Sequence, residues 1–211
     1  MDLVTLRQQK SARLKLQILE ASISLVGAAS FEELYVDAIC ERVKVSKVTL
    51  FKYFPQKDDI LLYYLRVWLL HRAVELSKNN KIGLKGLQYL QEKLCEAYAN
   101  HPGVILGLVS YLTSVKRPPS PVSLKAAERQ QLYSAEELKS VEIRSLHQLI
   151  ENFVLEAIFN REITKRSDTK EIADLFQSIL YGTFVTAHLN QITPIKIFMK
   201  RNIDLVMDGL R

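Results

Sequence analysis

Apolar residues recur along this chain with helical spacing, and the alternation typical of strands is almost absent. In the segment VDAICERV, which begins at Val36, the apolar residues stand at positions i, i+3, i+4 and i+7, which is one face of a helix. The pattern predicts an all-α protein with about nine helices. These helices are expected at residues 7–28, 36–43, 47–54, 57–79, 84–99, 103–115, 134–161, 169–190 and 194–210.

The positions of the prolines support these helix boundaries. Proline is tolerated in the first turn of a helix but breaks a helix interior. Pro55 precedes the fourth predicted helix, Pro102 opens the sixth and Pro194 opens the last. Between the sixth and seventh helices, the stretch 122–133 is predicted to be either a short additional helix or a mobile loop.

The second and third predicted helices are short and joined by a tight turn, which is the arrangement of a helix-turn-helix motif spanning 35–54. Ser46 is a good N-cap for the third helix, because its hydroxyl can accept a free N–H of the first turn. Pro55 ends that helix, since the residue before a proline is pushed out of the α region. Residues 42–57 contain five basic side chains and no Asp or Glu. This charge pattern favours a helix that lies in the major groove of DNA.

Two stretches of the chain resemble the TetR family of bacterial transcriptional regulators. They are ILEASISLV at 18–26 and VSKVTLFKYFPQKDDI at 45–60. The resemblance implies a DNA-binding domain of three helices at 1–56, followed by a helical domain at 57–211 that binds an effector and forms a dimer. It also implies a protein that is not an enzyme and has no cofactor: a transcriptional repressor that a small-molecule ligand releases from its operator.

Three positions depart from the family pattern. The family usually has glycine in the turn, where the chain adopts a left-handed conformation, and this chain has Lys44. A side chain in that conformation costs about 1 kcal/mol. Tyr35 and Gln56 replace the small polar residues that commonly cap the second and fourth helices. The expected fold is unaffected, but phosphate contacts are not carried over from the family to Tyr35 and Gln56.

The third predicted helix is the expected recognition helix. Its N-terminal end, where base edges are usually reached, carries Lys47, Val48 and Thr49. Lys47 suits a guanine or a phosphate, Val48 an apolar base contact, and Thr49 a phosphate or a thymine methyl. The predicted partner is a pseudo-palindromic operator in double-stranded DNA. The predicted DNA-binding residues are Lys44, Ser46, Lys47, Val48, Thr49, Lys52, Tyr53 and Lys57. The resemblance supports Thr49, Tyr53 and Lys57.

A second basic cluster lies near the start of the chain. Residues 3–19 contain Arg7, Lys10, Arg13 and Lys15 and no acidic residue. This cluster predicts either a further contact with phosphates or simply a solvated helix face.

The region from 57 to about 190 is rich in aromatic side chains. Most of them suit a hydrophobic core, and the resemblance implies that some enclose a small-molecule pocket. Few charges fall on the inward faces of these helices, so an apolar or amphipathic effector is expected. The candidate pocket residues are Tyr64, Trp68, Tyr98, Tyr111, His147, Phe153 and Gln177.

The C-terminal helices carry more apolar side chains than one small bundle needs. Two copies of such helices can bury the excess together in a four-helix bundle. The sequence therefore allows a homodimer, and the resemblance implies that the last two helices, 169–190 and 194–210, form its interface.

Composition narrows the possible functions. The 211 residues are 48% hydrophobic and 25% charged, as in a globular protein, and the net charge of +6 favours an acidic partner. No apolar run approaches the length of a membrane span, and Cys40 and Cys95 form no CxxC unit, so a cytoplasmic protein is expected. The spacing of the histidines predicts no metal site, and no catalytic motif is found. The alternative function is a helical adaptor or small-molecule carrier that does not read DNA.

Overall fold

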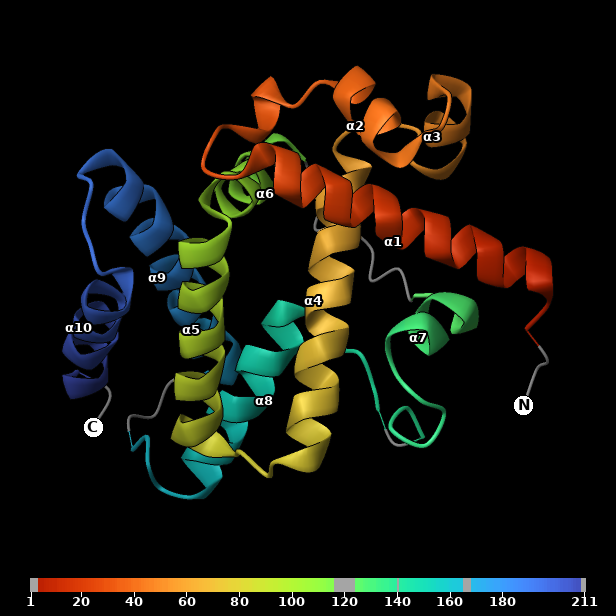
Figure 1. The fold of residues 1–211 in the computed structure, drawn as a ribbon. Helices are drawn as coiled ribbons and strands as arrows, with labels where there is room; N and C mark the ends of the chain where they lie inside the picture. Colours follow the sequence, from red (N-terminus) through yellow and green to blue (C-terminus); the bar gives the residue numbers. More distant parts are fainter. Residues whose placement is uncertain (1–3, 116–123, 140, 165–167, 210–211) are drawn as a thin grey trace. The chain divides into compact units, whose positions relative to one another are not determined.

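The computed structural model describes residues 4–115, 124–139, 141–164 and 168–209. Within these ranges it contains ten α-helices, one short 3-10 helix and no strand (Figure 1). The predicted all-α fold is therefore confirmed. In chain order the elements are α1 (Leu6–Val26), η1 (Phe31–Glu33), α2 (Val36–Val43), α3 (Lys47–Tyr53), α4 (Asp59–Lys78), α5 (Gly83–Asn100), α6 (Pro102–Ser114), α7 (Ala126–Leu132), α8 (Leu146–Phe159), α9 (Thr169–Leu189) and α10 (Ile195–Asp208).

The helix ends mostly lie within a few residues of their predicted positions, and the exceptions fall between α6 and α8. The stretch 122–133 contains the short helix α7, which begins at Ala126. Residues 122 and 123 lie outside the described ranges. Of the two alternatives for this stretch, the additional helix is the one observed.

The helix predicted at 134–161 is wrong at its start, because α8 begins only at Leu146. Ser145 caps α8 by accepting the N–H of Gln148 at 3.2 Å, and the side-chain oxygen of Gln148 accepts the N–H of Ser145 at 2.9 Å. This reciprocal pair is a capping box, which fixes the first turn of a helix. The periodic apolar residues before Ser145 continued the pattern but not the helix.

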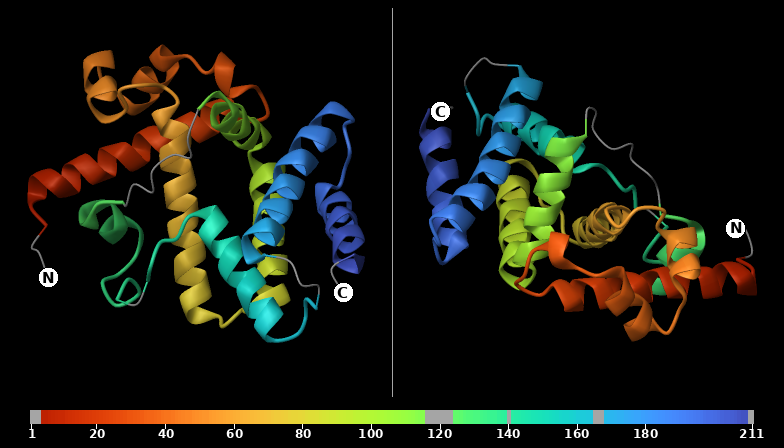
Figure 2. Two further views of the ribbon diagram at one scale, coloured as in Figure 1. Left: turned by 180° about the vertical axis from the view of Figure 1, so that it is seen from behind. Right: turned by 90° about the horizontal axis from the view of Figure 1, so that it is seen from above.

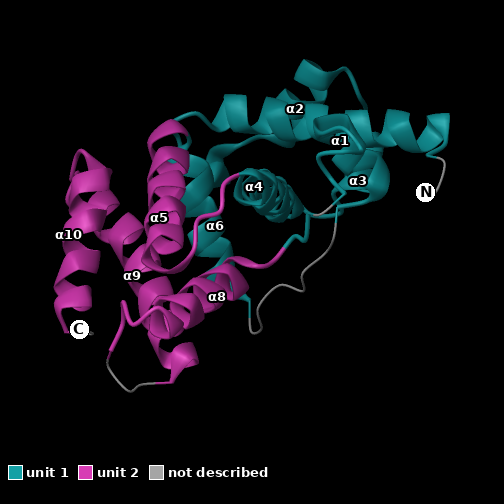
Figure 3. Ribbon diagram, turned by 90° about the horizontal axis from the view of Figure 1, so that it is seen from below, with its two compact units in different colours: residues 1–78, 101–143 teal, residues 79–100, 144–211 magenta. Residues whose placement is uncertain are grey.

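The chain forms two compact units, each built from two separate stretches (Figure 3). Unit 1 comprises residues 1–78 and 101–143, and unit 2 comprises residues 79–100 and 144–211. Compactness thus groups α4, α6 and α7 with the N-terminal helices. The domain boundary predicted between residues 56 and 57 divides the chain by function rather than by compactness, and it stays a prediction.

In unit 1, α1 packs against α2, α4, α6 and α7, and its inward face buries Ile18 completely (Figures 1 and 2). The approach of α6 is close. A Cβ atom at Gly103 would lie 1.8 Å from the carbonyl oxygen of Ala29, and one at Gly107 would lie 2.7 Å from the Cβ of Phe31. The two glycines are therefore what allows α6 to lie against η1 and the end of α1.

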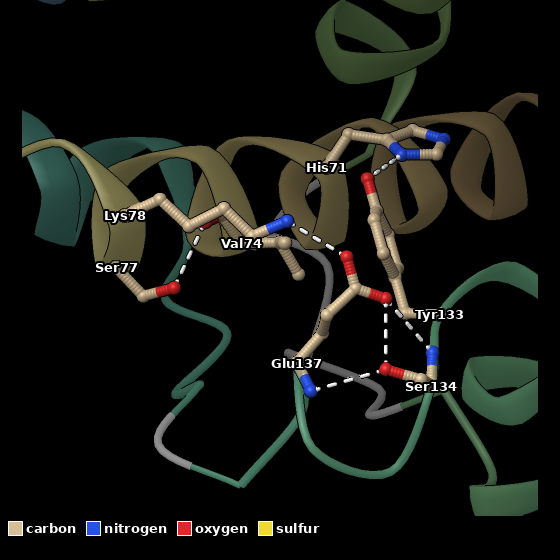
Figure 4. Close-up of polar contacts among 7 residues, drawn as sticks. All are labelled: His71, Val74, Ser77, Lys78, Tyr133, Ser134 and Glu137. Atoms are coloured by element: carbon tan, nitrogen blue, oxygen red, sulfur yellow. Dashed lines mark hydrogen bonds and ion pairs between the residues drawn. The ribbon is translucent and has the colours of Figure 1, made fainter.

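The α7 segment, defined as residues 124–139, is tied to α4 by two polar contacts (Figure 4). Tyr133 Oη and His71 Nδ1 share a hydrogen bond of 2.5 Å. Two turns further along α4, Lys78 Nζ donates to Glu137 Oε1 at 2.7 Å. Glu137 Oε2 accepts the N–H and the hydroxyl of Ser134, both at 3.0 Å. The hydrogen bond from Lys78, with those from Ser134, lowers the pKa of Glu137 to about 2, so this carboxylate stays charged at neutral pH.

In unit 2, α8 packs between α5 and α9, and α10 packs against α9 and α5. The ring of Phe153 lies directly over Gly86, where a Cβ atom would come within 2.3 Å of it. Between α9 and α10, the side-chain amide of Asn202 donates to the buried hydroxyl of Thr183 at 3.0 Å. Unit 2 therefore has an apolar core, and the buried hydroxyl of Thr183 has its hydrogen-bond partner between α9 and α10.

Candidate nucleic-acid interface

The helix-turn-helix reverses direction at Lys44, which follows α2 directly. Lys44 has φ 59° and ψ 49°, the left-handed conformation that normally favours glycine. The next residue, Val45, donates its N–H to the carbonyl of Cys40 at 3.0 Å, which closes the end of α2. The turn therefore has the conformation that the family pattern predicts, with an exposed lysine in place of glycine.

The start of α3 is fixed by Ser46, as predicted. Its hydroxyl accepts the N–H of Thr49 at 3.2 Å and lies 3.0 Å from the Thr49 hydroxyl. Leu50 and Phe54 are buried, at 0% and 2% exposure, and anchor α3 to the core. Val48 points the other way and is 81% exposed. An apolar side chain held out in this manner at the start of a helix is available to meet a base edge.

Lys47, the first residue of α3, forms an ion pair that the sequence reasoning missed. Its ammonium lies 2.7 Å from the carboxylate of Asp37, in the first turn of α2. This hydrogen bond, together with the charge of Asp37, raises the pKa of Lys47. Asp37 lies outside residues 42–57, the stretch without acidic residues, so the charge pattern did not indicate this pair. The helix-turn-helix fold brings Asp37 back to the start of the recognition helix.

Lys57, just before α4, is engaged by the backbone of unit 1. Its Nζ donates to the carbonyl oxygens of Phe31 at 3.2 Å, Glu32 at 2.9 Å and Leu34 at 3.4 Å. It also lies 5.3 Å from the centroid of the Phe31 ring. The three donors of the lysine ammonium are thus all directed at carbonyls of η1 and of the residue that follows it. In this arrangement Lys57 fastens the start of α4 to η1.

The C-terminal end of α3 joins the basic cluster of α1. Lys52 is exposed and Tyr53 half-buried, and both line a hollow of about 520 Å³ with Arg7 and Lys10. An adjoining hollow of about 410 Å³ shares Arg7, Lys52 and Tyr53 and extends to Lys125 before α7. Lys52 of one predicted basic cluster and Arg7, Lys10 and Lys15 of the other therefore border a shared basic surface, which is the kind of surface that attracts phosphates.

The candidate pocket residues are divided between the two units. Unit 1 holds Tyr64, Trp68 and Tyr111, and unit 2 holds Tyr98, His147, Phe153 and Gln177. Tyr64 and Trp68 are buried along α4, and burial raises the pKa of Tyr64 to about 12. Phe153 is a core residue between α5 and α8.

Two of the candidates in unit 2 lie in direct contact. His147 Nδ1 is 3.0 Å from Gln177 Oε1, and the amide of Gln177 donates to Tyr181 Oη at 2.9 Å. Tyr98 stacks on Phe184 with ring centroids 5.3 Å apart. The sequence reasoning did not select Tyr181 or Phe184 as partners, although each stands about one or two turns of α9 beyond Gln177.

Within the described ranges, the acidic, histidine and cysteine side chains form no group of three that could hold a metal ion. Over the same ranges, no helix is both long enough and apolar enough to span a membrane.

Comparisons with known proteins agree with this geometry. Residues 18–64 match the family model described as bacterial regulatory proteins, tetR family. None of the curated proteins matches the chain in sequence. Among solved structures, a TetR transcriptional regulator from Rhodococcus sp. RHA1 is 13% identical, with a TM-score of 0.58 over 96% of this chain and 99% of that one.

Two further structures share the fold. NemR from E. coli in its reduced form is 13% identical, with a TM-score of 0.58 over 94% of this chain and 98% of that one. The regulator FadR from Bacillus subtilis, in complex with stearoyl-CoA, is 19% identical, with a TM-score of 0.53 over 93% of this chain and 99% of that one. Residues 18–64 thus form a helix-turn-helix domain of the TetR family of bacterial regulatory proteins, and the solved structures share the fold of the chain over more than nine-tenths of its length.

Proposed function

We propose that the protein is a homodimeric repressor that binds a pseudo-palindromic operator through α3 and leaves it when a small apolar or amphipathic ligand binds. The observation that carries the proposal is the construction of α3. Leu50 and Phe54 anchor the helix, Ser46 caps it, and Val48 is held out at 81% exposure. A short helix presented in this manner fits the major groove.

The proposed contacts divide along the helix-turn-helix. Lys47, Val48 and Thr49 meet base edges or the nearest phosphates, because they form the first turn of α3. The phosphate contacts come from the turn, the cap and the end of α3. They are Lys44, Ser46, Lys52 and Tyr53, whereas Lys57, which the sequence pattern assigned to a phosphate, is proposed to hold the start of α4 to η1 through its carbonyl contacts. Among these, Lys52 and Tyr53 also border the basic surface shared with α1.

The proposed dimer forms through α9 and α10. These helices leave large apolar side chains exposed in the single chain, at 39% to 73% of their surface. The exposed residues are Leu175, Val185, Leu189, Ile197 and Leu205. Two copies can bury such side chains in a four-helix bundle, and a two-fold dimer presents two recognition helices to two half-sites.

The proposed ligand acts by opposing DNA. By linkage, ligand and operator weaken each other by the same free energy, typically about 1–3 kcal/mol. Most of the candidate ligand-binding residues are aromatic, in unit 1 and in unit 2 alike, which suits an apolar chain. FadR binds stearoyl-CoA in its solved complex, so an acyl-CoA is the first ligand to test here.

The test is fluorescence anisotropy on DNA that flanks the gene of this protein, against a random duplex, over a series of salt concentrations. We expect tight, salt-dependent binding with a preference for one pseudo-palindrome, and weaker binding once stearoyl-CoA is added. Equal weak binding to every duplex, including those selected from a random pool, would contradict the repressor and leave the adaptor or carrier. Analytical ultracentrifugation of the wild type and of Leu189→Glu tests the dimer, which the charged variant should dissociate.

A further inference from the structure

Lys15 of α1 connects four elements of unit 1 through one ammonium group. Its Nζ lies 2.9 Å from Glu128 Oε1 in α7. It also lies 5.6 Å from the ring centroid of Phe54 and 4.8 Å from that of Tyr63. Phe54 is the last residue of the helix-turn-helix, directly after α3, and Tyr63 belongs to α4. A cation at these distances from two aromatic faces is attracted by both rings.

The two rings fix the C-terminal end of α3 against α4. Phe54 and Tyr63 meet edge to face with centroids 5.5 Å apart, and they are exposed by only 2% and 1%. Because the ammonium of Lys15 lies beside both rings, a shift of Lys15 changes the packing beneath the recognition helix. Buried aromatic packing is dense, so a small displacement there moves the helix that rests on it.

Glu128 determines where the ammonium of Lys15 lies. The side chain of Glu128 is 5% exposed, and that of Lys15 is 20% exposed. The second oxygen of Glu128 accepts the N–H of Lys125 at 2.9 Å, which holds the carboxylate at the start of α7. The α7 segment is in turn fixed to α4 by the contacts of Tyr133 and Glu137 (Figure 4). A buried carboxylate held on this many sides is a rigid anchor for its ion-pair partner.

We propose that Glu128 is a positioning residue for DNA recognition, and that through Lys15 it sets the tilt of α3 with respect to α4. The inference rests on the proposed function, in which α3 reads the operator. It gives α7, a helix outside the helix-turn-helix, a part in recognition without any contact to DNA. The chain between α6 and α8 thereby influences how well the recognition helix fits its groove.

A positioning role has a signature that a phosphate contact lacks. A lysine that neutralises a phosphate contributes about one unit to the slope of log affinity against log salt concentration. The ammonium of Lys15 is committed to Glu128 and the two rings, so its loss should leave this slope unchanged. The ratio of specific to nonspecific affinity should change instead. A tilted α3 loses base contacts, but the protein keeps its attraction to the phosphate backbone of the DNA.

The experiment compares the wild type with Glu128→Gln, Lys15→Met and the double variant. The probes are the duplex that the wild type selects from a random-sequence pool and an unselected duplex, each over a salt series. We expect Glu128→Gln to lower the affinity for the selected duplex about tenfold, equivalent to about 1.4 kcal/mol, at unchanged slope. The double variant should be no weaker than Glu128→Gln alone, since the two residues act as one unit.

Two further variants complete the experiment. Glu96→Gln breaks the exposed pair of Lys93 and Glu96 on α5, at 2.8 Å, and should leave both affinities unchanged. Tyr133→Phe removes the hydrogen bond to His71 but keeps Lys15 and Glu128. It should lower the affinity ratio a few-fold and provides the test if Glu128→Gln does not fold, as judged by far-UV circular dichroism.

Three results would overturn the inference. The first is that Glu128→Gln and Tyr133→Phe both fold and both keep the wild-type ratio of specific to nonspecific affinity. Lys15→Met could lower the salt slope by about one, which would make Lys15 a phosphate contact. The changes in affinity could also match the loss of folded protein in thermal melts, which would make the pair merely structural. A wild type that selects no duplex at all would instead refute the proposed function, and the inference with it.

Discussion

The carboxylate of Asp37 lies 2.7 Å from the ammonium of Lys47, so an acid of α2 neutralises a base at the start of the recognition helix. Both side chains are exposed, by 72% and 56% respectively. Water and salt screen such a pair, and its two charges can separate readily. An operator that uses Lys47 must therefore draw it away from Asp37, and any DNA that approaches α3 meets both charges.

Asp37→Asn is expected to strengthen DNA binding. The freed ammonium of Lys47 no longer has to leave an ion pair, and a negative charge is removed from the surface proposed to face the phosphates. We expect an increase in affinity of about two- to fivefold at low salt, smaller at high salt. Anisotropy titrations with the selected and unselected duplexes measure it. Glu41→Gln removes an exposed acid later in α2 and is the matched control; a weaker Asp37→Asn would mean that Asp37 orients Lys47 for its base contact.

Val48 is expected to influence which sequence is preferred. Its side chain is 81% exposed at the start of α3 and carries no charge, so its replacement should not change the salt slope. Val48→Ala should therefore select a different set of duplexes from a random pool, with the altered positions confined to one or two base pairs of each half-site. An even loss of affinity over all duplexes, with the wild-type preference intact, would mean that α3 does not dock as proposed.

Lys44→Gly is expected to stabilise the fold. Lys44 adopts φ 59°, where a side chain is unfavourable and glycine is not. The greater freedom of glycine in the unfolded chain offsets part of the gain, so the increase should be at most about 1 kcal/mol. Thermal unfolding at equal protein concentration would show a rise in Tm of about 2–4 °C. Lys44→Gln removes the same charge but keeps a side chain in the left-handed turn, and it should not raise the Tm.

Lys57→Met separates two roles for this lysine. The sequence pattern assigns Lys57 to a phosphate, whereas its ammonium donates to three carbonyls in and directly after η1. Because those carbonyls would lose their partner, we expect a lower Tm and an unchanged salt slope. The slope is measured by anisotropy on the unselected duplex, with Lys52→Gln as the reference that should lose about one unit. A similar loss in Lys57→Met would show that Lys57 leaves η1 and binds a phosphate.

His71 is expected to make the stability of the protein depend on pH. Burial, together with the nearby charge of Arg72, lowers the pKa of His71, while Glu75 acts in the opposite direction. As the pH falls below about 7, the unfolded chain binds a proton at this histidine before the folded chain does, so the free energy of unfolding decreases. The neutral imidazole is also the form that can accept a hydrogen bond from the hydroxyl group of Tyr133.

The variant that tests this is His71→Gln, which stays neutral at every pH. Urea unfolding between about pH 7.5 and pH 5.5 should show a smaller decrease in stability for His71→Gln than for the wild type. His188→Gln, at an exposed position on α9, is the control. Equal slopes for the wild type and His71→Gln would refute the assignment.

Much of the fold could be predicted from the sequence because its signals are local. The N-cap at Ser46 and the apolar spacing of α2 act within one or two turns of helix, and both helices begin where they were expected. The start of α8 could not be predicted from periodicity, since the apolar pattern runs on through a stretch that the capping box at Ser145 excludes from the helix.

The contacts that modify the candidate site were missed because they join residues on different elements, whose approach to one another the local patterns do not indicate. Asp37 reaches Lys47 only after the helix-turn-helix has formed, and the carbonyls around Lys57 come from η1, an element that the pattern did not indicate. Glu128 and Lys15 are separated by more than a hundred residues. No local window of sequence contains both Lys15 and Glu128, so their ion pair becomes visible only in three dimensions.

The two glycines of α6 have a consequence for how such a regulator can evolve. Because Gly103 and Gly107 let α6 lie against Ala29 and Phe31, the helix-turn-helix part of unit 1 is completed by a helix that comes later in the chain. Exchanging the first 56 residues for those of a relative would set a foreign surface against this α6. The N-terminal helices therefore cannot be exchanged between relatives without a matching change in α6. In the proposed complex, a new operator preference arises more easily by single substitutions on the exposed side of α3, which leave the contacts of α6 with Ala29 and Phe31 intact.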